Sequence, residues 1–88
     1  MKIIWNDSKA ATNLKLHKVT FESAKPVFTD DLAITIEDNN HEEQRFVTIG
    51  IGENFILLVV VYCYPDETTI RLISARKAEP HERREYER

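Results

Sequence analysis

The spacing of apolar residues changes along the chain, and this change predicts the order of its elements. A helical period in the first third gives way to alternation of apolar and polar positions, and a charged helical pattern closes the chain. The predicted elements are a strand over Lys2–Trp5, helices over Asp7–Lys18 and Phe21–Phe28, strands over Leu32–Glu37, Arg45–Ile51, Phe55–Tyr64 and Thr68–Ala75, and a helix over Pro80–Arg88. The order β-α-α-β-β-β-β-α predicts an α+β fold, an antiparallel sheet with two N-terminal helices and a C-terminal helix.

The two N-terminal helices have clear start signals. Asn6 or Asp7 can cap the first helix, in which Ala10, Leu14 and His17 follow helical spacing. His17 therefore shares a face with apolar residues, near the C-terminal end of the helix. The second helix has Thr20 as its cap and Pro26 inside it, which predicts an irregular helix that ends by about Phe28.

The apolar segment Phe55–Tyr64 predicts the central strand of the sheet, because its residues are apolar on both faces. The short, β-branched first segment predicts a strand at an edge of the sheet. Pro65 and Asp66 predict a tight turn that makes the following strand antiparallel. The C-terminal helix begins at Pro80 and has only Tyr86 as a large apolar anchor, so we expect it to be weakly attached.

Length and composition narrow the class of protein. With 88 residues the chain holds one domain, residues 1–88, and its longest apolar run is far shorter than the about 20 residues of a membrane helix. A single cysteine, Cys63, and an N-terminus without a secretion signal favour the cytoplasm, and we expect Cys63 to be a buried thiol. His17, His41 and His81 lack metal-ligand spacing, and no glycine-rich phosphate loop is present, so we expect neither a metal nor a cofactor.

Charge is distributed unevenly around a net charge of −3. Residues 1–29 and 68–88 each carry more cations than anions, whereas residues 30–67 hold nine acidic residues against Arg45 alone. If the protein binds a polyanion, it does so with its two basic ends. The alternative is that the charges of the two basic ends are ordinary solvated surface charges and bind no polyanion.

The last predicted strand carries Arg71 and Arg76, and an arginine in a strand requires an anion as partner. Because an odd number of positions separates them, a regular strand would send them to opposite faces. Both reach one site only if the strand ends or bulges before Arg76. The alternative is that they form ion pairs with the acidic middle of the chain.

These cations suit cleavage of RNA by its own ribose 2′-OH, which requires a base, an acid and cations at the phosphate. An imidazole exchanges protons near neutral pH, so His17 is the candidate acid or base, and Arg45, Arg71 and Arg76 are candidates to hold phosphate. Trp5 or Tyr86 could stack on a base. The alternatives are that His17 only ends a helix, that Trp5 belongs to the core, and that Tyr86 only anchors its helix.

The chain also resembles a known family in positions that span nearly its whole length. The matching positions are Trp5, Lys9, Asn13, His17, Val19, Phe21, Ala24, Phe28, Asp30, Arg45, Gly50, Leu58–Val61, Arg71–Ala78, Glu82, Arg83 and Tyr86. They resemble the BrnT toxins of type II toxin-antitoxin systems, and the string Arg71–Ala78 followed by Glu82, Arg83 and Tyr86 is the most specific part. The family usually has Asp directly after the tryptophan and Lys-His-Gly around the histidine, whereas Asn6, Leu16 and Lys18 stand here.

The resemblance implies a RelE-like fold and a metal-independent endoribonuclease that inhibits translation. Lys9 and Lys77 belong to the matching positions and Lys18 flanks His17, so we expect these lysines, with Trp5 and Tyr86, to bind RNA. The implied partner is a BrnA-like ribbon-helix-helix antitoxin, through which alone the toxin would meet operator DNA. The alternative is a non-catalytic interaction module that keeps the fold and acts through Arg71, Arg76 and the C-terminal helix.

Overall fold

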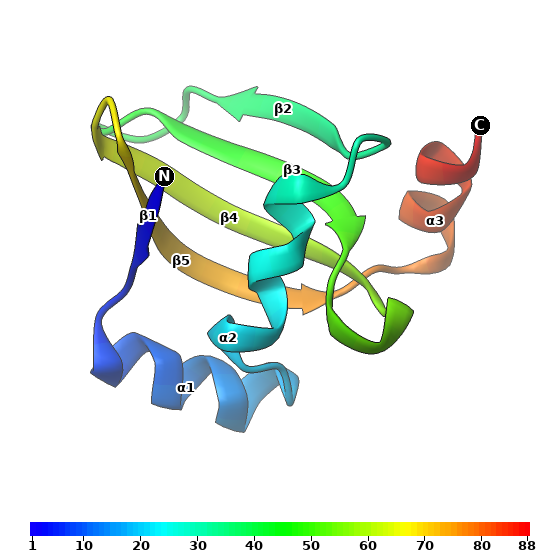
Figure 1. Cartoon of the computed structure of the whole chain (residues 1–88), viewed down its shortest axis with the longest axis horizontal. Helices are drawn as coiled ribbons and strands as arrows, with labels where there is room; N and C mark the ends of the chain where they lie inside the picture. The colour runs from blue at the N-terminus through cyan, green and yellow to red at the C-terminus, as the bar shows by residue number, and fades with distance from the viewer.

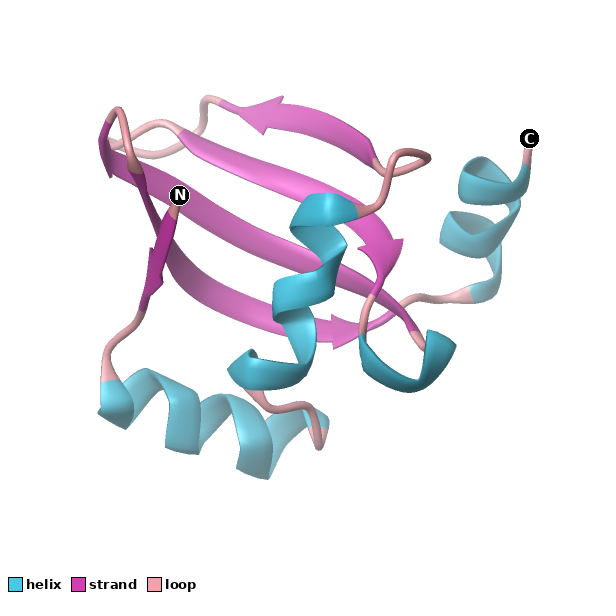
Figure 2. Ribbon diagram, in the orientation of Figure 1, coloured by secondary structure: helices cyan, strands magenta, loops and turns pink.

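The computed structural model describes all 88 residues and contains five strands, three α-helices and two 3₁₀ helices (Figures 1 and 2). In chain order the elements are β1 (Lys2–Ile4), α1 (Asp7–His17), α2 (Phe21–Ala24), η1 (Lys25–Thr29), β2 (Ile34–Asp38), β3 (Arg45–Ile51), η2 (Glu53–Phe55), β4 (Leu57–Asp66), β5 (Thr69–Lys77) and α3 (Pro80–Glu87). This is the order of helices and strands that the sequence predicts.

The strands form one sheet in the order β1-β5-β4-β3-β2, which places β1 at an edge and β4 at the centre as expected. The sheet is mixed, so the prediction of an antiparallel sheet is wrong for one pair: β1 runs parallel to β5. The other neighbours are antiparallel. The cause is the connection after β1, because α1, α2 and η1 carry the chain to β2 at the opposite edge. No hairpin turn therefore sets the direction of β1.

The helical connection between β1 and β2 covers one face of the sheet, and α2 and η1 cross in front of the strands in Figure 1. The main core lies between these helices and the sheet. It consists of Val19, Phe21, Ala24, Val27, Leu58, Val60, Tyr62, Ile70, Leu72 and Ala75. On the other face, Ile49, Leu57 and Val59 form a smaller cluster against which Ala78 and Tyr86 pack. The helical connection therefore covers one face of the sheet except at β2, where Thr35 and Glu37 are exposed, and α3 alone covers part of the other.

Helix α1 is joined to the sheet by a buried amide. Asn6 caps the helix, as predicted, by accepting hydrogen bonds from the backbone N–H groups of Ser8 and Lys9. Inside it, Asn13 donates to the carbonyl of Ala75 at 2.8 Å and accepts from the N–H of Ala75 at 3.0 Å. Because β1 pairs only with residues 69–71 of β5, the backbone groups along the rest of this edge have no neighbouring strand. Asn13 supplies the hydrogen bonds for the N–H and the carbonyl of Ala75.

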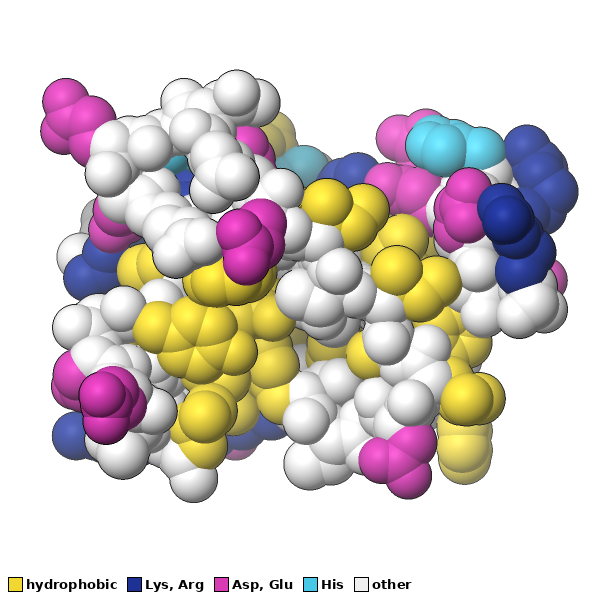
Figure 3. All heavy atoms as spheres, turned by 90° about the horizontal axis from the view of Figure 1, so that it is seen from above, with side chains coloured by type: hydrophobic (Ala, Val, Ile, Leu, Met, Phe, Trp, Pro, Cys, Tyr) yellow, Lys and Arg dark blue, Asp and Glu magenta, His cyan; other side chains and the backbone are white.

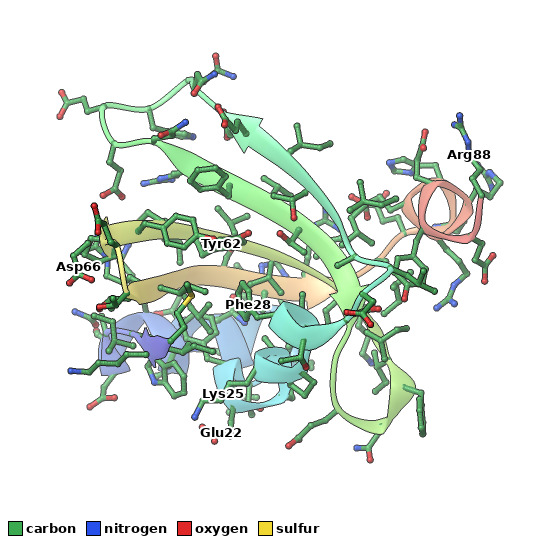
Figure 4. The ribbon with its side chains drawn as sticks, turned by 45° about the horizontal axis from the view of Figure 1, so that its top comes forward. Glu22, Lys25, Phe28, Tyr62, Asp66 and Arg88 are labelled. Atoms are coloured by element: carbon green, nitrogen blue, oxygen red, sulfur yellow. The ribbon has the colours of Figure 1, made fainter.

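The second helix is irregular, as Pro26 predicts. Its α-helical part ends at Ala24 and a 3₁₀ helix with Pro26 in its first turn continues to Thr29. This turn brings Phe28 edge-on against Tyr62 of β4, with ring centroids 4.9 Å apart, and Figure 4 shows the two side chains together. The irregular helix thus fills the core above the central strand.

The central strand begins later and ends later than predicted. Phe55 lies outside it, in η2, and is 90% exposed, because Asn54 and Phe55 both adopt left-handed backbone angles with φ near 58°. The strand continues through Pro65 and Asp66, which were expected to form the turn. The strand after it extends to Lys77, so Arg76 and Lys77 belong to β5.

No helix of the structure combines the length and the apolar composition needed to cross a bilayer.

Candidate active site

A bulge in β5 brings Arg71 and Arg76 to the same face of the sheet. Ser74 pairs with Val61 and Leu72 pairs with Tyr62, so Ile73 is an extra residue with no partner of its own in β4. Arg76 pairs with Val59 and Arg71 with Cys63, two residues of β4 that share a face. From the sequence, Arg71 and Arg76 could share one site only if the strand ended or bulged before Arg76. The structure contains such a bulge.

Arg45 lies on this same face, two strands away from Arg71. It alternates along β3 with Val47 and Ile49, which contribute to the smaller apolar cluster. We call the surface formed by Arg45, Arg71 and Arg76 the arginine face. It is the face of the sheet that α1, α2 and η1 leave uncovered.

Glu43 bridges two of these arginines. One carboxylate oxygen accepts a hydrogen bond from Arg71 Nη2 at 2.8 Å, and the other lies 3.6 Å from Arg45 Nε. The Arg45 Nε atom is buried and has no hydrogen-bond partner. Below them, burial raises the pKa of the Cys63 thiol, which confirms the prediction of a buried cysteine. The ion pairs with the acidic middle of the chain therefore exist for Arg45 and Arg71.

Arg76 has a different partner, Glu82 of α3. The two side chains form a bidentate pair with N···O distances of 2.8 and 2.7 Å. Hydrogen bonding from Arg76 lowers the pKa of Glu82 to about 2, and Glu82 also accepts a hydrogen bond from the backbone N–H of Glu79. This carboxylate is therefore a poor proton acceptor near neutral pH, and its geometry serves to hold α3 against β5.

Tyr86 provides the second anchor of α3. Its hydroxyl donates a hydrogen bond to Asp30 Oδ2 at 2.6 Å, which raises the pKa of Tyr86 to about 12. Burial acts to raise the pKa of Asp30, but hydrogen bonds from Tyr86 and from the N–H groups of Ile51 and Leu32 outweigh it and lower that pKa. The C-terminal helix has more anchors than the sequence indicated, and charged side chains of both signs gather at its end of the molecule (Figure 3).

His17 lies at the free edge of β5 and not among the arginines. Together with Lys9 of α1 and Ser74 of β5 it lines a hollow of about 260 Å³. The side chain of Ser74 shares the face of Arg71 and Arg76, since it pairs with Val61. This hollow therefore opens beside the arginine face, at the bulge.

The remaining predicted RNA-binding residues are divided between two places. Trp5 packs against the main core, with its ring 5.8 Å from that of Phe21 and the Lys25 ammonium 5.3 Å from its centroid. Lys18 and Lys77 line one hollow of about 300 Å³ on the helix-covered side of the molecule. Trp5 has no hydrogen bond or ion pair to the arginines of β3 and β5, whereas the carbonyl of Lys77 accepts a hydrogen bond from Arg76 Nη1 at 3.3 Å.

The sequence analysis missed the acidic partners, Glu43 and Glu82. Glu82 was noted only as a matching position, and its spacing of six residues from Arg76 belongs to no single helix or strand pattern. Glu43 falls in a loop whose path cannot be inferred from periodicity. Elsewhere, no three His, Cys, Asp or Glu side chains converge in a way that would hold a metal ion.

The fold and the arginine face together define a small α+β protein with a cationic sheet surface. A family model described as "Ribonuclease toxin, BrnT, of type II toxin-antitoxin system" matches residues 5–82, and the chain belongs to this family. The resemblance seen in the sequence is thereby confirmed. As a type II toxin, a member of this family has an antitoxin as its partner.

A solved structure agrees with this assignment. The crystal structure of the Brucella abortus ribonuclease toxin BrnT superposes with a TM-score of 0.70 at 25% sequence identity, covering 90% of this chain and 97% of that chain. A comparison with curated protein sequences returns no match.

Proposed function

We propose that this chain is a metal-independent endoribonuclease of RelE-like type, one domain over residues 1–88, that cuts RNA by attack of a ribose 2′-OH on the adjacent phosphate. The observation that carries the proposal is the bulge at Ile73, because it gathers Arg71 and Arg76 on the sheet face that also carries Arg45. Guanidinium groups bind phosphate oxygens bidentately, and their charge stabilises the pentacoordinate state in which negative charge accumulates.

In this proposal Arg45 and Arg71 bind the scissile phosphate after it displaces Glu43. Arg76 lies further along β5 and contributes charge to the adjoining part of the RNA strand, while its pair with Glu82 holds α3. His17 and Lys9 contact the RNA strand at the free edge of β5. That His17 acts as the acid or the base of the reaction stays a prediction, and the pH profile of a His17 variant tests it. The other proposed RNA contacts are Trp5, Lys18, Lys77 and Tyr86.

We further propose that cleavage inhibits translation and growth, and that a BrnA-like ribbon-helix-helix antitoxin neutralises the toxin by covering its basic ends. Operator DNA would be bound only by that antitoxin, since this chain has a net charge of −3. The single cysteine, buried and unpaired, agrees with a cytoplasmic site of action.

The proposal is tested with total RNA, EDTA and the purified chain, alone and in complex with the protein encoded beside it. The free chain should produce fragments in EDTA, and the complex should not. A chain that binds the neighbouring protein but leaves RNA intact would favour a non-catalytic interaction module. Cleavage that EDTA abolishes would contradict metal independence.

A further inference from the structure

His41, an imidazole without a role so far, lies in the loop after β2, whose last residue lies opposite Arg45 of the arginine face. Asp38, the last residue of β2, pairs directly with Arg45 of β3. The Nε2 atom of His41 lies 3.3 Å from Asp38 Oδ2, while Asp38 Oδ1 accepts the backbone N–H of Asn40 at 3.1 Å. The carboxylate is thus fixed by its own turn on one side and faces the imidazole on the other.

The charged groups around this pair come from four elements. Arg45 lies on β3 and Glu43 in the loop before it. Arg71 lies on β5, opposite Cys63 of β4. His41 is 41% exposed and Asp38 is 29% exposed, so the imidazole is held in place and remains accessible to a large substrate. Asp38 with its neighbour His41 and the two arginines therefore lie at the same end of the sheet.

His17, Glu82 and Tyr86 are less suited to proton transfer at this phosphate. His17 lies at the free edge of β5 and lines a hollow with Ile73 and Ser74. Neither Arg45 nor Arg71 lines this hollow. Glu82 and Tyr86 have pKa values of about 2 and about 12, far from the range in which a group exchanges protons at neutral pH.

We propose that His41, oriented by Asp38, is the proton-transfer group for a phosphate bound by Arg45 and Arg71; this rests on the proposed ribonuclease activity. Asp38 Oδ2 lies 3.3 Å from Nε2 and favours the proton on that nitrogen, which leaves Nδ1 free to take the proton of the 2′-OH. The 2′-oxygen then bonds to phosphorus, the bond from phosphorus to the 5′-oxygen breaks, and the imidazolium returns the proton to the 5′-oxygen. The products are a 2′,3′-cyclic phosphate and a 5′-hydroxyl, with no change of oxidation state.

The first experiment measures cleavage against pH for the full chain and three variants. His41→Gln should lower the rate by about 10²-fold or more and remove the pH limb that an imidazole gives. His17→Gln should keep that limb. His81→Gln is the matched control, since His81 is 65% exposed on α3 and has only Glu79 beside it. Added imidazole should restore part of the activity of His41→Ala and none of that of Arg71→Ala.

The second experiment does not depend on activity. A 2′-O-methyl RNA oligonucleotide, which cannot be cut by this route, is titrated into the full chain while the imidazole resonances are followed by NMR. His41 should shift and His81 should not, and the His41 shift should shrink in Asp38→Asn. A parent rate and pH profile in His41→Gln, or a shift at His17 without one at His41, would overturn the inference. A parent chain that leaves RNA intact would instead overturn the ribonuclease activity.

Discussion

Arg71 and Arg76 lie on the same face of β5 although five positions separate them, because the bulge at Ile73 shifts the alternation of side chains by one residue. The consequence is that both cations lie on the sheet face that carries the smaller apolar cluster. Both arginines have acidic partners inside the chain, but the partners differ. Arg71 binds the loop residue Glu43, whereas Arg76 binds Glu82 and thereby holds a helix.

This difference predicts different effects on stability. Arg71→Ala removes a pair whose side chains are 42% and 43% exposed, so the free energy of unfolding should change by no more than about 0.5 kcal/mol. Arg76→Ala leaves Glu82, which is 14% exposed, without its main partner and should cost about 1–2 kcal/mol. Urea unfolding of both variants measures this, and equal losses would contradict the anchoring role of Arg76.

The pair between Arg76 and Glu82 also predicts how stability changes with pH. The pKa of Glu82 is about 2 in the folded chain, against an ordinary value of 4.5, so its contribution to stability is present above about pH 5 and is lost as the pH falls through about 2. The difference in unfolding midpoint between the parent and Glu82→Gln should therefore be constant above pH 5 and disappear near pH 2. Glu85→Gln, which removes a 58% exposed partner of Arg88, should show no such change.

Glu43 competes with RNA for Arg45 and Arg71, so removing its charge should favour binding. Glu43→Gln should bind the 2′-O-methyl RNA oligonucleotide several-fold more tightly than the parent at low salt, because phosphate no longer displaces a carboxylate. Fluorescence anisotropy gives the dissociation constants, and Glu22→Gln, which removes the same charge from α2 on the opposite face of the sheet, is the control. Unchanged or weaker binding by Glu43→Gln would show that this carboxylate does not compete with phosphate.

The sequence predicted the elements and their order well because the period of apolar residues changes clearly at Asp30 and again after Lys77. It did not predict the parallel pairing of β1 with β5, since no local signal sets the direction of a strand that lacks a hairpin. For the site, the odd spacing of Arg71 and Arg76 indicated that a bulge was required. The partners of these arginines depend on where a loop and a helix return to the sheet, which is a property of tertiary structure.

His41 illustrates the same point. In the sequence it is one of several polar residues in an acidic loop, and nothing in its spacing relates it to Arg71 thirty positions later. The register between β2 and β3 places Asp38 opposite Arg45 and so brings His41 to the arginines. The pairing of β2 with β3 therefore indicates His41 as a proton-transfer group, whereas the sequence alone indicated His17.

The most direct test of the account compares the parent chain with Arg71→Ala on one RNA oligonucleotide in EDTA, with analysis of the fragment ends. Arg88→Ala serves as the charge-matched control, because Arg88 is 76% exposed at the C-terminus and pairs only with Glu85. The account predicts fragments that end in 2′,3′-cyclic phosphate for the parent and for Arg88→Ala, and a rate at least about 10²-fold lower for folded Arg71→Ala. Cleavage by Arg71→Ala at the parent rate would contradict the central claim that the arginine face binds the phosphate that is cut.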